Sequence, residues 1–365
     1  MIVTLYRNNS YNVDVLFNVG HTISFSGFQS SDKMSHDDTL FLPDNGPCFI
    51  MIGCWMVEKD TTKEVRTERV RVLVNPRSGL GGSLSETLRV IELAWNERGA
   101  EVSYQFSNDV ADGVAKTRRA VDEGVDVLLV VGGDGMVNTI GAQLVGSSVA
   151  FGVIPTGSGN GFARHFNIPL SAEKAVKALV GAERKLIDVG IANGRAFFVT
   201  CSMAWDAALV KYFEKSPIRG ILPYIFAGAQ GMFEFKAQPF KVVLDENAEH
   251  EFPDPLIFTI ANLTQFGGGA QIAPEACADD GQLELVVVSR QDLPRMLMEL
   301  PRLFNGTINQ LSQVSTFHFK RLRVIRSSPA EMQLDGELLE APAEIQVGLR
   351  ERALRVLVPR IAEVE

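Results

Sequence analysis

The feature that most constrains this sequence is a regular alternation of apolar strands and amphipathic helices that starts at residue 69. Four runs are typical of strands: "RVRVLV", "EVSYQF", "VDVLLVV" and "SVAFGVI". Three segments between them have the apolar spacing of helices: 83–99, 109–124 and 135–146. We expect Ser83 or Ser85 to cap the first helix and Asp109 the second. This order predicts parallel β-α-β units with right-handed crossovers.

The pattern changes after residue 160. Two helical stretches, 161–166 and 171–182, precede a predicted hairpin that turns at Ala192-Asn193-Gly194. The strands that follow are interrupted by one expected helical insertion, 293–308: "FKVVLD", "PLIFTIANL", "QLELVVVS", "TFHFKRLRVIRS" and "AEIQVGL". Runs of strands with few helices predict a mainly antiparallel second domain.

These patterns divide the chain into four parts. Residues 1–65 form an N-terminal extension without a clear period, and Met56 is an alternative start of the chain. An α/β domain is expected over 66–187, and a β-sandwich domain over 188–349. We expect the C-terminal segment, 350–365, to return to the first domain.

Charge and composition exclude several classes of protein. The net charge of -9 excludes a general nucleic-acid-binding surface. The four cysteines form no CxxC, which favours a reducing cytoplasm. No apolar run reaches the roughly 18 to 20 residues of a transmembrane helix. Two uncharged apolar stretches, 48–57 and 220–233, are either core or surfaces that contact lipid.

Three glycine-rich loops follow predicted strands: "NPRSGLGG" at 75–82, "GGDGMVN" at 132–138 and "PTGSGNGFAR" at 155–164. In an open parallel sheet, ligands bind beyond the carboxyl ends of the strands. Glycine lets backbone N–H groups approach an anion, and the second and third loops lead into helix N-termini. Any one of these loops alone could be an ordinary tight turn. Together they predict a phosphate ligand, although neither GxxxxGK[ST] nor GxGxxG occurs.

The motifs "VNPRSG", "VVGGDGMVN", "IPTGSGNGFAR", "APEACADDGQLEL" and "LDGE" resemble those of the diacylglycerol kinase and sphingosine kinase superfamily of lipid kinases. The resemblance covers roughly residues 69–358. It implies a doubly wound α/β nucleotide domain, like that of NAD kinase and 6-phosphofructokinase, followed by a mainly antiparallel β-sandwich. The active site is then expected between the two.

By this resemblance the glycine loops bind ATP, and Asp134 holds Mg²⁺ or a donor near its phosphates. The implied nucleotide-binding residues are Asn75, Arg77, Ser78, Gly79, Ser107, Gly132, Gly133, Asp134, Gly135, Asn138, Thr156, Gly157, Ser158, Gly159 and Asn160.

The superfamily's general base is an acid in a late DGE motif, here Asp335-Gly336-Glu337. The resemblance implies that Glu337 accepts the proton of the lipid hydroxyl and that Asp335 positions it. On residue type alone, "LDGEL" is a hairpin turn. The choice between Asp134 and Glu337 as proton acceptor stays open at this point.

A second cation site is implied at "ADDGQ". Asp280 matches a position that binds a structural Mg²⁺ in bacterial relatives, helped by positions that match Cys277 and Gln282. Backbone carbonyl oxygens at 277 and 282 would suffice as ligands. Asp279 is an adjacent candidate, and a plain Asp-Gly turn is the alternative.

The acceptor lipid is less constrained. Bacterial members that act on diacylglycerol or phosphatidylglycerol commonly show Asn-Asp in the third loop, whereas this chain has Asn160-Gly161, which looks closer to the sphingosine kinase-like version. This difference weakens diacylglycerol as the default acceptor without establishing a sphingoid base. Segment 220–233, preceded by "MAWDAALV", lies where the superfamily builds its acyl-chain pocket. Trp205 and Phe233 belong either to that pocket or to the sandwich core.

The sequence is thus identified as a member of a lipid kinase family that uses ATP and Mg²⁺ to phosphorylate diacylglycerol or a sphingoid-type base. The alternatives are a NAD kinase-like enzyme with a soluble acceptor and a catalytically silent nucleotide-binding regulator. We expect a cytoplasmic protein that contacts membranes transiently. Superfamily members often dimerise through the sandwich, so a homodimer is also an expectation.

Overall fold

The computed structural model describes residues 67–76, 84–208, 235, 237–290 and 292–360, together with four strands of the preceding region. The chain forms two compact units, Met1–Arg66 and Thr67–Glu365. In the first unit the strands pair antiparallel in the order β3-β2-β1-β4, with bounds β1 (Val3–Asn9), β2 (Asn12–Phe17), β3 (His21–Ser26) and β4 (Cys48–Phe49). Met56 and most of 48–57 lie outside the described residues.

The second unit begins with a parallel sheet in the order β6-β5-β7-β8. Its strands are β5 (Arg69–Val74), β6 (Glu101–Phe106), β7 (Val127–Gly132) and β8 (Ala150–Pro155). Both β7 and β8 are buried along their whole length. Strands with a helix layer on each face need continuous apolar runs, and this explains "VLLVVG" and "AFGVIP".

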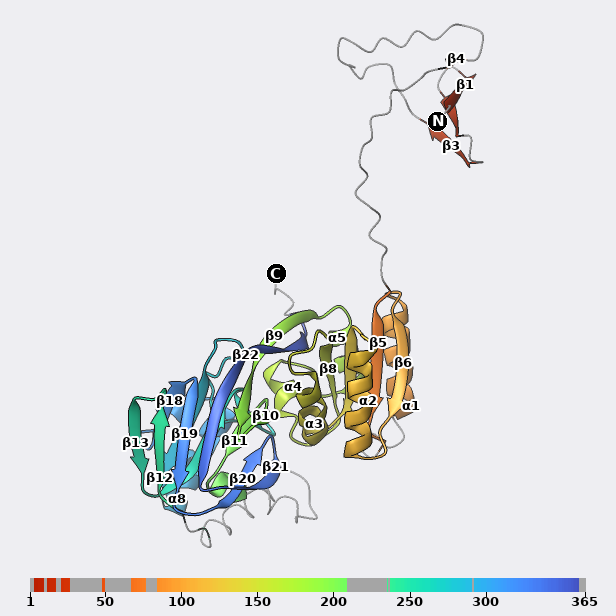
Figure 1. Cartoon of the computed structure of the whole chain (residues 1–365). Coiled ribbons are helices and arrows are strands. Elements are labelled where there is room, and N and C mark those ends of the chain that lie inside the picture. The colour runs from red at the N-terminus through yellow and green to blue at the C-terminus, as the bar shows by residue number, and fades with distance from the viewer. Residues whose placement is uncertain are drawn as a thin grey trace, which may run out of the picture. The chain divides into compact units, whose positions relative to one another are not determined.

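Helices cover both faces of this sheet. One pair in contact is α1 (Leu84–Asn96) with α5 (Ala172–Leu179), and the other is α2 (Val110–Asp122) with α3 (Asp134–Leu144) (Figure 1). The strand order reverses between β5 and β7, and such a switch point is where open α/β sheets bind ligands. The predicted doubly wound α/β fold is confirmed.

The second half of the unit is antiparallel, as predicted. A six-stranded sheet has the order β18-β17-β14-β11-β20-β21. Its strands are β11 (Thr200–Ser202), β14 (Pro255–Ala261), β17 (Leu283–Ser289), β18 (Val314–Phe319), β20 (Ala330–Leu334) and β21 (Glu337–Ala341).

Four further strands extend the parallel sheet beyond β8 in the order β22-β19-β12-β13. They are β12 (Phe240–Leu244), β13 (Ala248–Phe252), β19 (Arg321–Arg326) and β22 (Glu344–Val358). Apolar side chains of β12, β19 and β22 pack against those of β11, β14, β17 and β20 in one buried cluster. This cluster is the core of the β-sandwich.

The long strand β22 connects the two halves of the unit. Its first residues pair antiparallel with β19, and its later residues pair antiparallel with β9 (Glu183–Ala192) and parallel with β8. The predicted hairpin joins β9 to β10 (Arg195–Phe197), with Asn193 and Gly194 at positive φ, as a two-residue I′ turn requires.

Two expectations are corrected. The stretch "TFHFKRLRVIRS" is two strands, β18 and β19, which lie in different sheets. The chain changes sheet at Lys320, where the Asp245 carboxylate accepts the N–H groups of Lys320 and Arg321.

The expected single helix 293–308 is divided into three elements: α8 (Leu293–Glu299), α9 (Pro301–Phe304) and a 3-10 turn (Ile308–Gln310). The first break occurs because Pro301 has no N–H to continue α8.

Candidate functional site

The carboxyl ends of the four parallel strands are joined by backbone hydrogen bonds. Ser107 N donates to Val74 O over 2.8 Å, Thr156 N donates to Gly132 O over 3.1 Å, and Asn75 N donates to Val131 O over 3.4 Å. The loops that contain Asn75, Ser107, Gly132 and Thr156 therefore share one edge of the sheet, as predicted. Arg77, Ser78 and Gly79 lie outside the described residues.

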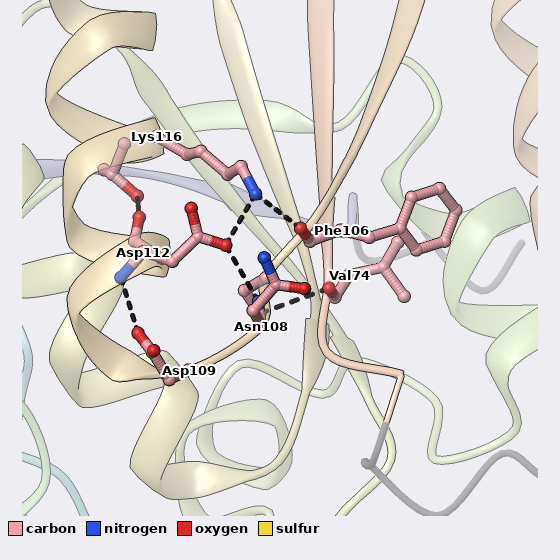
Figure 2. Close-up of polar contacts among 9 residues, drawn as sticks. Val74, Phe106, Asn108, Asp109, Asp112 and Lys116 are labelled. Carbon is pink, nitrogen blue, oxygen red and sulfur yellow. Dashed lines mark hydrogen bonds and ion pairs between the residues drawn. The ribbon is translucent and has the colours of Figure 1, made fainter.

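Ser107 is buried at the end of β6. Asp109, Asp112 and Lys116, at the start of α2, fix the loop that follows (Figure 2). The Asp109 carboxylate caps the helix by accepting Asp112 N over 2.8 Å. The Asp112 side chain accepts Asn108 N over 2.8 Å, which returns the chain toward Ser107. Lys116 Nζ donates to Asp112 Oδ2 and to the carbonyl oxygen at the end of β6, both over 2.6 Å. This arrangement follows from the "DVAD" start of the helix.

Asp134, the first residue of α3, joins the second glycine loop to the third. Its Oδ2 accepts Asn160 N over 2.7 Å, and its Oδ1 accepts Gly161 N over 3.0 Å. Burial raises the pKa of Asp134 above its ordinary value, and the two backbone N–H bonds lower it by less. Each carboxylate oxygen keeps a lone pair, so the group can still bind a cation.

The glycines of these loops let the two backbones approach each other. A Cβ on Gly159 would lie 2.8 Å from Asp134 Oδ2, and a Cβ on Gly157 would lie 3.0 Å from Gly133 Cα. Asn160, at φ 52, closes the third loop: its Oδ1 accepts Gly157 N over 3.0 Å and its Nδ2 donates to Gly157 O over 2.7 Å. Much of this glycine content therefore serves loop-to-loop packing.

A fourth glycine run, at 267–269, was not predicted as part of the site. It begins at the last residue of β15 (Gln265–Gly267) and ends directly before β16 (Ala270–Gln271). Gly268 N donates to Gly159 O over 2.9 Å, and Arg164 Nε, from α4 (Gly161–His165), donates to the same oxygen over 3.1 Å. The three consecutive glycines in "QFGGGAQ" were the available signal.

Gly135 and Ser158 lie on the exposed side of these loops. Both are exposed, and a Cβ built on Gly135 meets no atom within 4 Å. The buried hydroxyl of Thr156 has no hydrogen-bond partner among the described residues. Gly135, Ser158 and the backbone of α3's first turn are available to an anion.

The LDGE motif is the turn between β20 and β21, with Asp335 and Gly336 both at positive φ. The buried Asp335 carboxylate accepts the backbone N–H groups of Phe198, Val199 and Thr200, over 2.7, 2.8 and 2.9 Å. Burial raises the pKa of Asp335, and the hydrogen bonds oppose that effect. Asp335 is thus committed to holding the chain where it crosses between the two sheets.

Asn138 connects this turn to the glycine loops. Its Nδ2, on α3, donates to Asp335 Oδ2 over 2.7 Å and to Ala196 O over 3.3 Å. The structure therefore brings together four predicted residues: Asp134, Asn138, Asn160 and Asp335.

Glu337 differs from the other two acids. It is exposed, and its carboxylate makes no hydrogen bond or ion pair with the part of the chain that the structure describes. Gln333, which was not predicted, fixes the turn that precedes it: its Oε1 accepts Gly336 N over 2.7 Å, and its Nε2 donates to Ser202 Oγ over 2.8 Å.

The predicted cation turn is anchored separately. Asp188, a buried acid in β9 that was not predicted, accepts Gly281 N over 2.7 Å and donates its own N–H to Ala278 O over 2.7 Å. Asp280 Oδ1 accepts Gln282 N over 3.0 Å, and Asp279 forms an ion pair with Lys185.

Among the described residues, no three His, Cys, Asp or Glu side chains are grouped to hold a metal ion. Cys277 Sγ faces Asp279 Oδ1 over 3.4 Å rather than Asp280. A cation at this turn would therefore depend on the Asp280 carboxylate, backbone carbonyl oxygens and water. Within the described ranges, no helix is long and apolar enough to cross a membrane.

Two family models match adjacent parts of the chain. The diacylglycerol kinase catalytic domain matches residues 69–192, and the YegS C-terminal NAD kinase beta sandwich-like domain matches residues 200–358.

Relatives with known names match over most of their length. A diacylglycerol kinase of Mycobacterium tuberculosis is 29% identical over 300 residues, which are 80% of this chain and 96% of that protein. One of Staphylococcus saprophyticus is 25% identical over 278 residues, 74% of this chain and 89% of that protein. The crystal structure of a diacylglycerol kinase of Bacillus anthracis shares the fold, with a TM-score of 0.63 and 20% identity over 82% of this chain and all of that one.

Proposed function

Because this chain belongs to the diacylglycerol kinase and sphingosine kinase superfamily of lipid kinases, we propose that it transfers the γ-phosphoryl group of ATP to a hydroxyl group of a membrane lipid. Diacylglycerol and a sphingoid-type base are the two acceptor classes. The relatives' names favour the first, and Asn160-Gly161 weakens it as the default without establishing the second.

ATP binds at the switch point of the parallel sheet. Its phosphates lie against the open side of the glycine loops, formed by Gly135, Ser158 and the first turn of α3. The helix N-terminus favours negative charge there. Asn75 and Ser107, at the ends of β5 and β6, contact the rest of the nucleotide, with Arg77, Ser78 and Gly79 from the first loop.

Asp134 is the residue that would hold Mg²⁺. Its carboxylate is partly buried, and the positive charge of Arg164 lowers the pKa of Asp134, by less than the hydrogen bonds do. Free lone pairs on a hard oxygen ligand suit Mg²⁺, which neutralises charge on the transferring phosphoryl group when it is bound. At the second turn, Asp280 with the carbonyl groups of Cys277 and Gln282 binds a structural Mg²⁺.

Glu337 is the general base, and one contrast carries this assignment. Asp134 and Asp335 each accept backbone N–H groups, whereas Glu337 is exposed and makes no such bond to a described residue. Proton transfer needs a carboxylate free to reach the attacking hydroxyl. Gln333 and Asp335 hold the turn, and Asn138 ties it to the nucleotide loops.

The test is transfer of labelled phosphate from ATP with Mg²⁺ to a mixed-lipid extract. Wild type is compared with Glu337→Gln and with the matched control Glu340→Gln, which changes another exposed acid of β21. We expect Glu337→Gln to lose about 10²- to 10⁴-fold in rate and the control to retain it. Equal loss in both variants would contradict the role of Glu337.

The same assay separates the proposal from its rivals. A labelled lipid identifies the acceptor class by its mobility. Tight ATP binding without any labelled lipid would contradict the lipid acceptor and favour a soluble one or a regulatory role.

A further inference from the structure

Exposed apolar side chains are concentrated on one short segment of the second unit. The large hydrophobic residues that are most exposed in the described chain number seven, and three of them lie within residues 297–304. Leu297 and Met298, on α8, are 43% and 75% exposed, and Phe304, on α9, is 39% exposed. We call these three residues the α8–α9 patch. Single exposed apolar residues are ordinary, but a local group of them indicates a binding surface.

The inner side of the same segment is firmly packed. Met296 packs against the buried residues Trp205 and Leu256, and Leu303 packs against a second buried cluster that includes Ile272 and Val286. The helices therefore have an anchored face, and the α8–α9 patch lies on the face that remains.

The segment borders the candidate active site. A Cβ on Gly269 would lie 4.0 Å from Phe304 Cδ1 and 3.8 Å from Arg164 Nη1. Gly269 belongs to the fourth glycine run, which bonds to Gly159 of the nucleotide loops. At the other end, Met296 touches Trp205, three residues after β11, the strand that pairs with β20 of the LDGE hairpin.

Charge and size indicate what covers this face. Arg302 is half-buried and lies between the two parts of the patch in the sequence, and its guanidinium has no hydrogen bond or ion pair with a described residue. A stable protein interface buries about 800 Å² on each partner, far more than three half-exposed side chains supply. Shallow apolar insertion next to a cation suits the interface of a bilayer, where acyl chains meet phosphate groups.

We propose that the α8–α9 patch inserts into the surface of a lipid bilayer and that Arg302 contacts lipid phosphates beside it. This inference rests on the proposed lipid kinase function, since it explains how an acceptor held in a membrane reaches Glu337. In the docked state the fourth glycine run and the nucleotide loops lie close to the bilayer.

The test uses the full chain and vesicles of phosphatidylcholine, with or without phosphatidylglycerol. The variant Leu297→Gln/Met298→Gln is compared with Leu93→Gln/Leu170→Gln, which changes two exposed apolar residues elsewhere in the second unit, 51% and 42% exposed. In sedimentation with vesicles we expect the first variant to partition at least about tenfold less than wild type and the control to be unchanged. Arg302→Gln should reduce binding only to the anionic vesicles, by about fivefold.

Activity distinguishes the two proposals. With a short-chain acceptor dissolved without vesicles, both double variants should phosphorylate lipid as fast as wild type. With acceptor embedded in vesicles, only Leu297→Gln/Met298→Gln should be slow. Absence of lipid phosphorylation by wild type in both formats would overturn the proposed function. Equal vesicle binding by wild type and both variants would contradict the proposal that the α8–α9 patch inserts into the bilayer.

Self-association is the competing use of this face. If wild type were a dimer without vesicles, and Leu297→Gln/Met298→Gln a monomer with unchanged vesicle binding, the patch would belong to a second copy of the chain and the membrane proposal would be wrong.

Discussion

Asn138 and Asp335 are 197 positions apart in the sequence, yet Nδ2 of the first lies 2.7 Å from Oδ2 of the second. One residue lies on the helix that follows the second glycine loop, and the other in the turn that presents Glu337. Their hydrogen bond therefore sets the position of the proposed base relative to the proposed phosphate site.

Breaking this connection should lower both stability and activity. Asp335→Asn replaces a buried acceptor of four N–H bonds with a group that can accept at one oxygen only, so we expect the free energy of unfolding to fall by about 3 kcal/mol. Asn138→Ala should cost about 1 to 2 kcal/mol. Urea unfolding measures both, and Glu337→Gln is the control, with an expected change within about 0.5 kcal/mol because that side chain is exposed. A stable Asp335→Asn variant would show that its N–H bonds contribute little.

Two glycines of the site should respond oppositely to alanine. Gly135→Ala adds a methyl group in open space within α3 and should stabilise the protein by about 0.5 to 1 kcal/mol. The same methyl group should weaken ATP binding, because it occupies the side assigned to the phosphates. Gly159→Ala puts a Cβ 2.8 Å from Asp134 Oδ2 and should cost about 1 to 3 kcal/mol. Thermal unfolding and nucleotide titration of both variants check this pair, and unchanged ATP affinity in Gly135→Ala would count against the phosphate assignment.

Asp206 should make stability fall as the pH rises. It is buried, and it accepts the N–H groups of Ala204 and Ala207; burial raises its pKa from 3.8 to about 6. Between these pH values the folded state binds the proton that the unfolded state has released, so stability decreases through this window, by about 3 kcal/mol in total. The difference in unfolding free energy between wild type and Asp206→Asn, measured from pH 4 to 7, should shrink by that amount. A difference that does not vary with pH would show that Asp206 titrates normally.

The titration of His165 should make stability fall as the pH falls. Burial lowers its pKa from 6.5 to about 4, and its Nδ1 lies 3.3 Å from Thr264 N, which donates to it. The unfolded state binds the proton first, so the stability contribution is complete above pH 6.5 and is lost as the pH falls toward 4. We expect a loss on the order of 2 to 3 kcal/mol in wild type relative to His165→Asn, which keeps an acceptor near that position. Urea unfolding at several pH values measures this loss. If the unfolding free energies of wild type and His165→Asn depend on pH in the same way, the pKa of His165 is not lowered.

The parallel half of the fold was predictable because its signals are local. The buried runs of β7 and β8 and the DVAD cap of α2 each specify their element within a few residues. The Asn193-Gly194 turn was predictable for the same reason, since only certain residues adopt positive φ easily. The glycine loops were identified as one site because parallel strands end at a common edge.

Long-range contacts were the part that the sequence did not reveal. Nothing near Asp335 indicates that its carboxylate binds the chain at Phe198, and nothing near Asp134 indicates that it holds Asn160. The sheet change at Lys320 depends on Asp245, about 75 residues earlier. Asp188 and Gln333 were missed because the sequence around an isolated polar residue in an apolar strand does not indicate which residue it bonds to.

The long strand β22 has a consequence for synthesis of the chain. The edge of β8 next to it is covered by residues near Val356, which leave the ribosome well after β8 and the rest of the α/β layer. Until then the nascent α/β layer presents an unpaired edge of a fully apolar strand, the kind of surface that recruits chaperones or pairs with other chains. Correct folding of this edge is therefore delayed until β22 has been made, and an early stop codon shortly before residue 344 would leave a product prone to aggregation even though every glycine loop had been made.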